Sequence, residues 1–133
     1  MTVVGSSAPE REFGPLSRTD IVRYAAAVGD FNPVHHDEFY ARAAGFRTVF
    51  SVGMFQAALL ATYVTDWLGA ANVRSFRVRF RAQVWPGDTV TCSGVITEVR
   101  ETPEGPVATV ELMARRQGGE LVLTGSAAFR TPQ

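Results

Sequence analysis

Residues 54–68 read MFQAALLATYVTDWL, an apolar stretch whose large side chains recur at three- and four-residue spacing. This spacing predicts an α-helix, and Gly69 directly after it is a common helix end. The few polar residues of the stretch do not form a continuous stripe along one side. We therefore expect a helix that is buried on most of its circumference and lies at the centre of the fold.

The hydrophobic period changes from about 3.6 to 2 after this helix, which indicates β-strands. In residues 75–82, apolar side chains alternate with three arginines, Arg77, Arg79 and Arg81, as in a strand with one buried face. Turn residues separate this strand from three further predicted strands, which cover residues 89–99, 107–116 and 120–130. Four long antiparallel strands therefore follow the buried helix.

The segment before the apolar helix begins with an extended arm. Residues 1–16 contain glycines and prolines among polar residues, which predicts at most a short strand over residues 2–4. Ser17 and Asp20 form a shortened capping signal before apolar residues at helical spacing. This pattern predicts a helix over residues 18–28.

Residues 30–37 form the next loop in our interpretation. Pro33 favours an extended backbone for Asn32, which keeps the segment out of any helix. Asp37 is a candidate cap for a short helix over residues 38–44. Loops of this kind often carry functional residues.

This order of elements predicts an α+β fold in one domain that spans residues 1–133. A helix that is buried all round needs a surface that covers it, and a curved antiparallel sheet supplies one. The hot-dog fold meets this description. Such a sheet leaves edge strands and an arginine-rich face, so we expect the chain to pair into a dimer.

Composition and charge narrow the classes of function. The chain has 133 residues, 46% of them hydrophobic, and a formal net charge of zero. It can bury a core, but it has no global field that attracts nucleic acid or an anionic membrane. Its length leaves no room for a dinucleotide-binding domain beside a substrate domain. All 13 basic residues are arginine, which either reflects codon usage or suits a phosphate-bearing ligand.

Cysteine count and hydropathy bear on metal binding and location. Cys92 is the only cysteine, so the chain has no intrachain disulfide and no four-cysteine zinc site. No apolar run reaches the roughly 18 to 20 residues that cross a bilayer, and no signal-peptide pattern opens the sequence. We therefore expect a soluble cytoplasmic protein that does not bind membranes.

Both histidines of the chain, His35 and His36, lie on the loop that also carries Asp30. Asp30 and His35 are five residues apart with a proline-stiffened turn between them. The two side chains can therefore face one water molecule, as general acid–base catalysis requires. An alternative is that Asp30 only caps the turn. Adjacent histidines do not easily bind one metal ion, so we expect no metal site and interpret His36 as a surface or packing residue.

The run Gly29-Asp30-Phe31-Asn32-Pro33-Val34-His35 resembles the hydratase signature of MaoC-like proteins. This family includes the (R)-specific enoyl-CoA hydratases and related acyl dehydratases. Downstream, Val52-Gly53-Met54 opens the apolar helix at the place where the family usually has His-Gly-Met. The resemblance covers residues 16–130.

The resemblance implies a hot-dog enzyme that adds water syn across the double bond of a trans-2-enoyl-CoA thioester, or removes water in the reverse direction. Asp30 and His35 would be the catalytic pair. Gly53 would bind the thioester oxyanion through its backbone N–H at the positive end of the helix dipole. Asn32 would orient the loop at the substrate site. No cofactor is implied, since the coenzyme A thioester is itself the substrate.

Three short runs resemble the small subunits of actinobacterial two-component hydratases: MTVVG at residues 1–5, HHD at residues 35–37 and YVTDW at residues 63–67. This resemblance implies a steroid side-chain or very long acyl group, and a place in fatty acid metabolism or steroid degradation. It also implies either a homodimer or a heterodimer or heterotetramer with another hot-dog subunit. Val52 departs from the family pattern, since it replaces the usual histidine.

Two other functions stay open. Acyl-CoA thioesterases also have hot-dog folds, but by resemblance they place their carboxylate elsewhere and lack this loop. The other alternative is a non-catalytic subunit that completes the acyl pocket of a partner, and the presence of both Asp30 and His35 argues against it. The three arginines of residues 75–82 either receive the phosphates of coenzyme A or form a solvated strand face.

Overall fold

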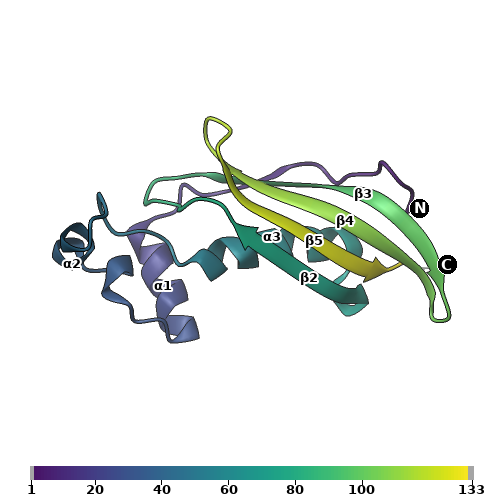
Figure 1. The fold of residues 1–133 in the computed structure, drawn as a ribbon, viewed down its shortest axis with the longest axis horizontal. Coiled ribbons are helices and arrows are strands. Elements are labelled where there is room, and N and C mark those ends of the chain that lie inside the picture. Colours follow the sequence, from purple (N-terminus) through teal and green to yellow (C-terminus); the bar gives the residue numbers. More distant parts are fainter. Residues whose placement is uncertain (1, 132–133) are drawn as a thin grey trace.

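A curved antiparallel sheet of five strands wraps one long helix (Figure 1). The computed structural model describes residues 2–131. Its elements in chain order are β1 (Arg11–Phe13), α1 (Arg18–Val28), η1 (Pro33–His35), α2 (Glu38–Ala43), α3 (Gly53–Leu68), η2 (Ala70–Asn72), β2 (Val73–Phe80), β3 (Val90–Thr102), β4 (Gly105–Arg116) and β5 (Leu121–Arg130). The strand order is β1-β3-β4-β5-β2, so β1 and β2 are the edge strands. The predicted hot-dog architecture is confirmed.

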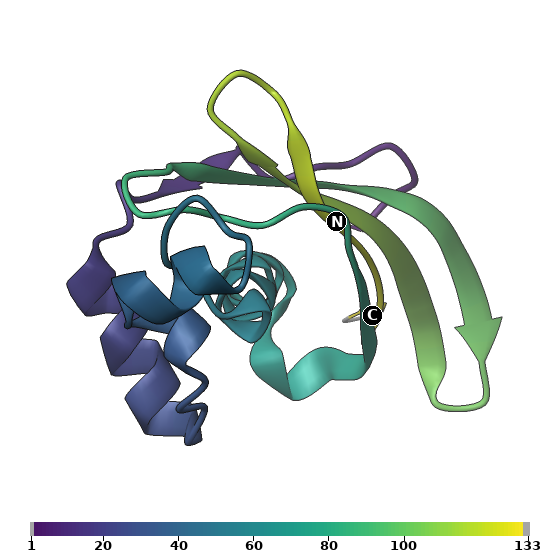
Figure 2. The ribbon, with the colours of Figure 1, turned by 60° about the vertical axis from the view of Figure 1, so that its left-hand side comes forward.

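The helix α3 lies in the hollow of the sheet, which curves over it (Figure 2). Its residues Ala57, Leu60 and Val64 are almost fully buried and share one hydrophobic core with sheet residues such as Leu112 and Phe129. Removing this apolar surface from water is the main force that holds the helix against the sheet.

The bounds and burial of α3 confirm the predicted central helix. It begins at Gly53, one residue before the predicted start, and ends at Leu68. Within it, only Met54, Thr62 and Asp66 are exposed, and positions four or eight residues apart lie in one row on a helix surface. The helix is therefore buried on most of its circumference.

The four predicted strands are present, although their ends are shifted. β2 lies two residues earlier than the pattern predicts. β3 and β4 extend toward each other until Thr102 pairs with Gly105. The hydroxyl of Thr102 donates to the carbonyl of Gly105 at 2.6 Å. The ladder therefore includes residues whose composition is typical of a turn.

The arm contains a strand that the sequence did not predict, and it lies outside residues 2–4. Val4 and Gly5 form a turn, and the N–H of Gly5 donates to the carbonyl of Ile96 at 2.8 Å. A strand forms instead at β1, whose three residues pair with residues 90–92 of β3. The β1 sequence, Arg-Glu-Phe, has no strand pattern of its own, so this pairing depends on the distant partner strand.

Helices α1 and α2 lie at the end of the molecule where α3 begins (Figure 1). α1 has the predicted bounds, and Ser17 and Asp20 form a full capping box. Tyr24 of α1 stacks on Phe55 of α3, with ring centroids 4.9 Å apart. This stacking brings the loop after α1 close to the start of α3. No helix within residues 2–131 is long and apolar enough to span a bilayer.

Candidate active site

The loop after α1 is held by short-range hydrogen bonds. Gly29 ends α1 with a φ of 75°, a left-handed conformation that glycine adopts at little steric cost. The Asp30 carboxylate accepts from the N–H of Asn32, and the Asn32 side chain accepts from the N–H of Val34, each at 3.2 Å. The second bond begins η1, so the prediction that this loop contains no helix is wrong. Pro33 fits the first helical position because that position needs no N–H donor.

His35 is anchored by the segment that leads into α3. Its side chain is buried, and its Nδ1 lies 2.8 Å from the carbonyl oxygen of Phe50. A carbonyl oxygen can only accept, so Nδ1 carries the proton of this bond. The neutral imidazole therefore has its lone pair on Nε2. The ring of Phe50 also packs edge-on against the imidazole, with centroids 5.2 Å apart, which fixes the ring orientation.

Asp30 and His35 lie close together, as the sequence predicts. Nε2 of His35 lies 3.5 Å from Oδ2 of Asp30. The Asp30 side chain is 37% exposed, whereas that of His35 is 9% exposed. The free oxygen of the carboxylate and the free nitrogen of the imidazole thus face the same partly open space. One water molecule there can donate a hydrogen bond to each of them.

Gly53 lies at the first position of α3 and leaves its backbone N–H free. Val52 before it makes no side-chain cap, and no acceptor for the Gly53 N–H is found within residues 2–131. Free N–H groups and the helix dipole make this end attractive to an oxyanion. A Cβ at position 53 would lie 3.0 Å from the ring of Phe80, so only glycine fits without displacing that ring.

A groove lies beside Gly53 at the start of α3. Phe50, Gly53, Phe80 and Arg81 line it, and Phe50 is the residue whose carbonyl holds His35. Phe50 therefore lines the groove at Gly53 and also holds His35 through its carbonyl, whereas Asp30 and His35 themselves are not among the residues that line this groove.

Two buried polar residues also line this groove, and the sequence analysis assigned them no role. The hydroxyl of Ser51 donates to the side-chain oxygen of Gln56 at 2.6 Å, and both residues are buried. The signal in the sequence was Gln56 itself, a polar residue within the apolar helix. The bond fixes the Gln56 amide at the base of the groove.

The remaining polar residues of the loop have other positions. His36 is exposed, and the Asp37 carboxylate caps α2 by accepting from the N–H of Tyr40 at 3.1 Å. Cys92 is buried in the sheet, and this burial raises the pKa of its thiol to about 12. Within residues 2–131, no three His, Cys, Asp or Glu side chains are grouped in a way that could hold a metal ion. Asn32 caps η1, and a contact of its side chain with substrate stays a prediction.

The described geometry agrees with the comparison with known proteins. The MaoC-like domain matches residues 3–115 of the chain. The chain belongs to the MaoC-like family. Asp30, His35 and Gly53 all lie within the matched residues.

Two relatives and two solved structures show what this MaoC-like chain is similar to. It is 37% identical to the 3-oxo-4,17-pregnadiene-20-carboxyl-CoA hydratase beta subunit of Mycobacterium tuberculosis, over 92% of both chains. It is 31% identical to the (R)-specific enoyl-CoA hydratase of Aeromonas caviae, over 95% of this chain and 99% of the relative.

The solved structures have the same fold over nearly the whole chain. A chain of the ChsH1-ChsH2 complex from Mycobacterium tuberculosis superimposes with a TM-score of 0.86 at 33% identity, covering 99% of this chain and 100% of that one. The (R)-hydratase from A. caviae involved in PHA biosynthesis gives a TM-score of 0.86 at 28% identity, covering 98% of both.

Proposed function

We propose that this chain is a hydro-lyase that adds water to a trans-2-enoyl-CoA thioester and gives an (R)-3-hydroxyacyl-CoA. The geometry of Asp30 and His35 carries the proposal. The Nδ1–H of His35 is bonded to the Phe50 carbonyl, and its Nε2 lies 3.5 Å from the Asp30 carboxylate. Relatives named as enoyl-CoA hydratases and as a 3-hydroxybutyryl-CoA dehydratase support this reaction class.

The reaction follows from these positions. A water molecule held between Asp30 and His35 attacks C3 of the substrate while Nε2 of His35 accepts one of its protons. The π electrons of the double bond move toward the thioester oxygen, whose negative charge the N–H of Gly53 stabilises. A proton then passes from this pair to C2, the thioester carbonyl forms again, and one water has been added to one face. These steps need no cofactor, and we propose that the chain uses none.

Substitution of the acid–base pair tests the proposal. We expect Asp30→Asn and His35→Gln each to lower turnover about 10²- to 10⁴-fold, the usual contribution of general acid–base catalysis. The assay is the loss of enoyl absorbance with crotonyl-CoA and with a bulky, branched enoyl-CoA. His36→Gln is the matched control, since His36 is exposed and makes no contact with the pair. Parent-like rates in either active-site variant, or release of free thiol without hydration, would contradict the proposal.

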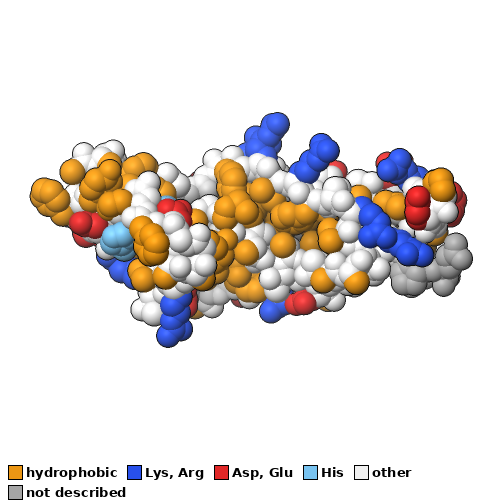
Figure 3. Space-filling model, turned by 90° about the horizontal axis from the view of Figure 1, so that it is seen from below, with side chains coloured by type: hydrophobic (Ala, Val, Ile, Leu, Met, Phe, Trp, Pro, Cys, Tyr) orange, Lys and Arg blue, Asp and Glu red, His pale blue; other side chains and the backbone are white. Residues whose placement is uncertain are grey.

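We infer that the acyl group is bulky and that a second hot-dog subunit completes the site. Similarity to the beta subunit of a steroid-type hydratase and to a chain of a two-component complex supports this inference. Hydrophobic side chains also form a band along one face of the molecule (Figure 3). Faster hydration of the bulky substrate than of crotonyl-CoA is the expected result. Cytoplasmic localisation stays a prediction.

A further inference from the structure

Three arginines form a row along the outer face of the edge strand β2 and the residue that follows it. Arg77, Arg79 and Arg81 are all exposed, and they alternate with the residues that face α3. In the ladder, Arg77 is opposite Ser126 and Arg79 is opposite Thr124 on β5. Alternate residues of a strand are about 7 Å apart, so the row presents positive charge at regular intervals beside two hydroxyl groups.

Four other arginines are neutralised by a carboxylate, and within the described residues the three arginines of the row are not. Arg11, Arg18, Arg42 and Arg116 each have an Asp or Glu oxygen at 2.6–3.0 Å. No ion pair or side-chain hydrogen bond of Arg77, Arg79 or Arg81 is found in the described part of the chain, residues 2–131. Like charges on one strand face repel each other. The row therefore has unsatisfied capacity for an anion.

The row lines a groove that meets the candidate active site. The three arginines line this outer groove together with Thr124, Ser126 and Glu111. Arg81 lines the groove at Gly53 as well. A ligand bound at Gly53 can thus continue past Arg81 onto the row without leaving the surface.

We propose that Arg77, Arg79 and Arg81 bind the phosphates of the nucleotide end of a coenzyme A thioester. This inference rests on the proposed function, because it extends the same substrate away from the reacting carbons. A guanidinium binds phosphate oxygens through two parallel N–H bonds, and the hydroxyls of Thr124 and Ser126 can donate to the same oxygens. The nucleotide end of coenzyme A carries phosphates at separate positions, so different arginines of the row can each bind one of them.

Glu111 sets the limit of the site on the other side. Glu111 is on β4, where it pairs with Ser126 of β5. Because β4 is two strands away from β2, the Glu111 backbone is about 10 Å from the backbone of the row. Its charge repels phosphate, so the phosphates bind at the β2 and β5 side of the groove. Removing the charge of Glu111 should therefore strengthen phosphate binding, whereas removing the charge of an arginine should weaken it.

A comparison of two thioesters of the same enoyl group tests the proposal. One carries coenzyme A, and the other carries N-acetylcysteamine, which has no phosphate. In the Arg77→Gln/Arg79→Gln variant, we expect the ratio of kcat/KM for the coenzyme A substrate to that for the truncated substrate to fall about 100-fold, about tenfold for each charge-assisted contact. Arg81→Gln should lower the ratio about tenfold.

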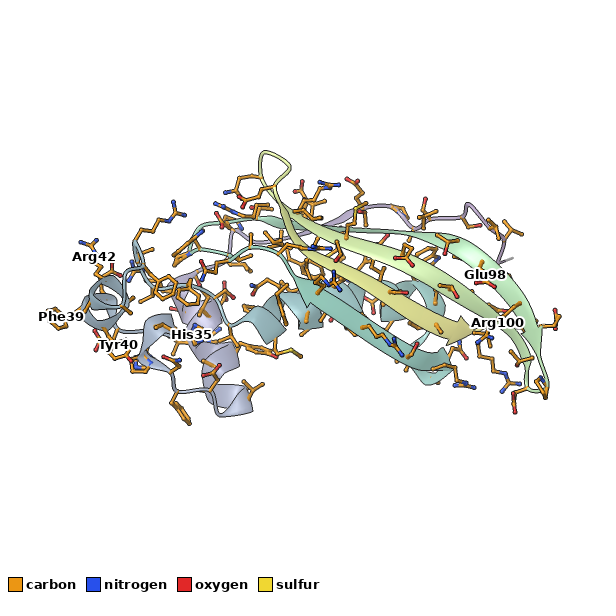
Figure 4. The ribbon with its side chains drawn as sticks, in the orientation of Figure 1. His35, Phe39, Tyr40, Arg42, Glu98 and Arg100 are labelled. Carbon is orange, nitrogen blue, oxygen red and sulfur yellow. The ribbon has the colours of Figure 1, made fainter. Side chains whose placement is uncertain are left out.

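Arg100→Gln is the matched control. Arg100 is an exposed arginine on β3 at the opposite end of the molecule from His35 (Figure 4). We expect it to leave the ratio of the two kcat/KM values unchanged. A fall in the ratio equal to that of the β2 variants would overturn the proposal, because net charge alone would then explain the effect.

Calorimetry with adenosine 3′,5′-bisphosphate measures binding without activity. We expect the β2 variants to weaken it about tenfold for each arginine, and Glu111→Gln to strengthen it. Equal losses on both thioesters, or unchanged binding of the bisphosphate, would overturn the proposal. Bisphosphate binding by the arginines without hydration of either thioester would reject the proposed function and keep the phosphate site.

Discussion

A backbone carbonyl determines which nitrogen of His35 acts. The Phe50 oxygen accepts the Nδ1–H, so Nε2 is left to accept a proton beside Asp30. This proton position depends on Phe50, which lies against the imidazole although it is fifteen residues away in sequence. The identity of the two residues could be predicted from the loop sequence. The tautomer could not be, because it depends on a contact between separate segments.

The substitution Gly53→Ala tests whether the groove needs the close approach between the α3 backbone and the Phe80 ring. In Gly53→Ala, the new Cβ would lie 3.0 Å from the Phe80 ring, so the ring moves and the groove narrows. We expect kcat/KM to fall by about tenfold, as for small misplacements of substrate. Thermal stability should not fall, because alanine favours helix more than glycine does.

The double variant Gly53→Ala/Phe80→Leu separates crowding from other effects of the alanine. We expect it to recover part of the lost kcat/KM, since leucine leaves more room beside the new methyl group. A kcat/KM equal to that of the parent in Gly53→Ala alone would show that the groove does not need this close approach.

At the scale of elements, one carboxylate links the helices around the site. The Glu38 carboxylate on α2 accepts from the Thr48 hydroxyl at 2.7 Å and pairs with Arg18 of α1 and with Arg42. The hydrogen bond from Thr48, followed by those from the two arginines, lowers the pKa of Glu38 from 4.5 to about 2. These contacts tie α1 and α2 to the segment that carries Phe50.

The contacts of the Glu38 carboxylate should make the stability of the protein depend on pH. Because the folded-state pKa of Glu38 is lower than 4.5, its contribution is complete above about pH 4.5 and is lost as the pH falls toward 2. We expect Glu38→Gln to be less stable than the parent at neutral pH and to lose less stability across this acid range. Urea unfolding at several pH values measures both. Parallel stability curves for the two proteins would contradict the assigned role.

At the scale of the whole molecule, the sheet is open at β2. This strand pairs with β5 on one side and is the last strand of the sheet. Large apolar side chains are also exposed, including Phe31 at 70% and Phe39 at 84%. Open strand edges and apolar patches are usually covered by association.

We therefore expect the isolated chain to associate with itself in solution. Analytical ultracentrifugation over a dilution series should give a mass of at least twice 14.5 kDa at micromolar concentration. A mass of one chain that still hydrates the enoyl thioester would show that neither a second copy nor another subunit is needed. Addition of the partner subunit, once identified, should shift the mass further.

Most of the local structure follows from local sequence. The bounds of α1 and the position of α3 agree with prediction because capping residues and a 3.6-residue period act over neighbouring residues. The four long strands could be predicted for the same reason, since the alternation of apolar and polar residues is visible within each strand by itself. The proximity of Asp30 and His35 also follows from local sequence, because both lie in one loop.

The sequence by itself predicted helices α1, α2 and α3 and the four long strands, and it placed Asp30 and His35 on one loop. Tertiary structure alone decided the pairing of β1 with β3, the proton position on His35 and the junction of two grooves at Arg81. The physical reason is the same in each case. These features arise where segments distant in sequence meet, and no periodicity within one segment describes its partner.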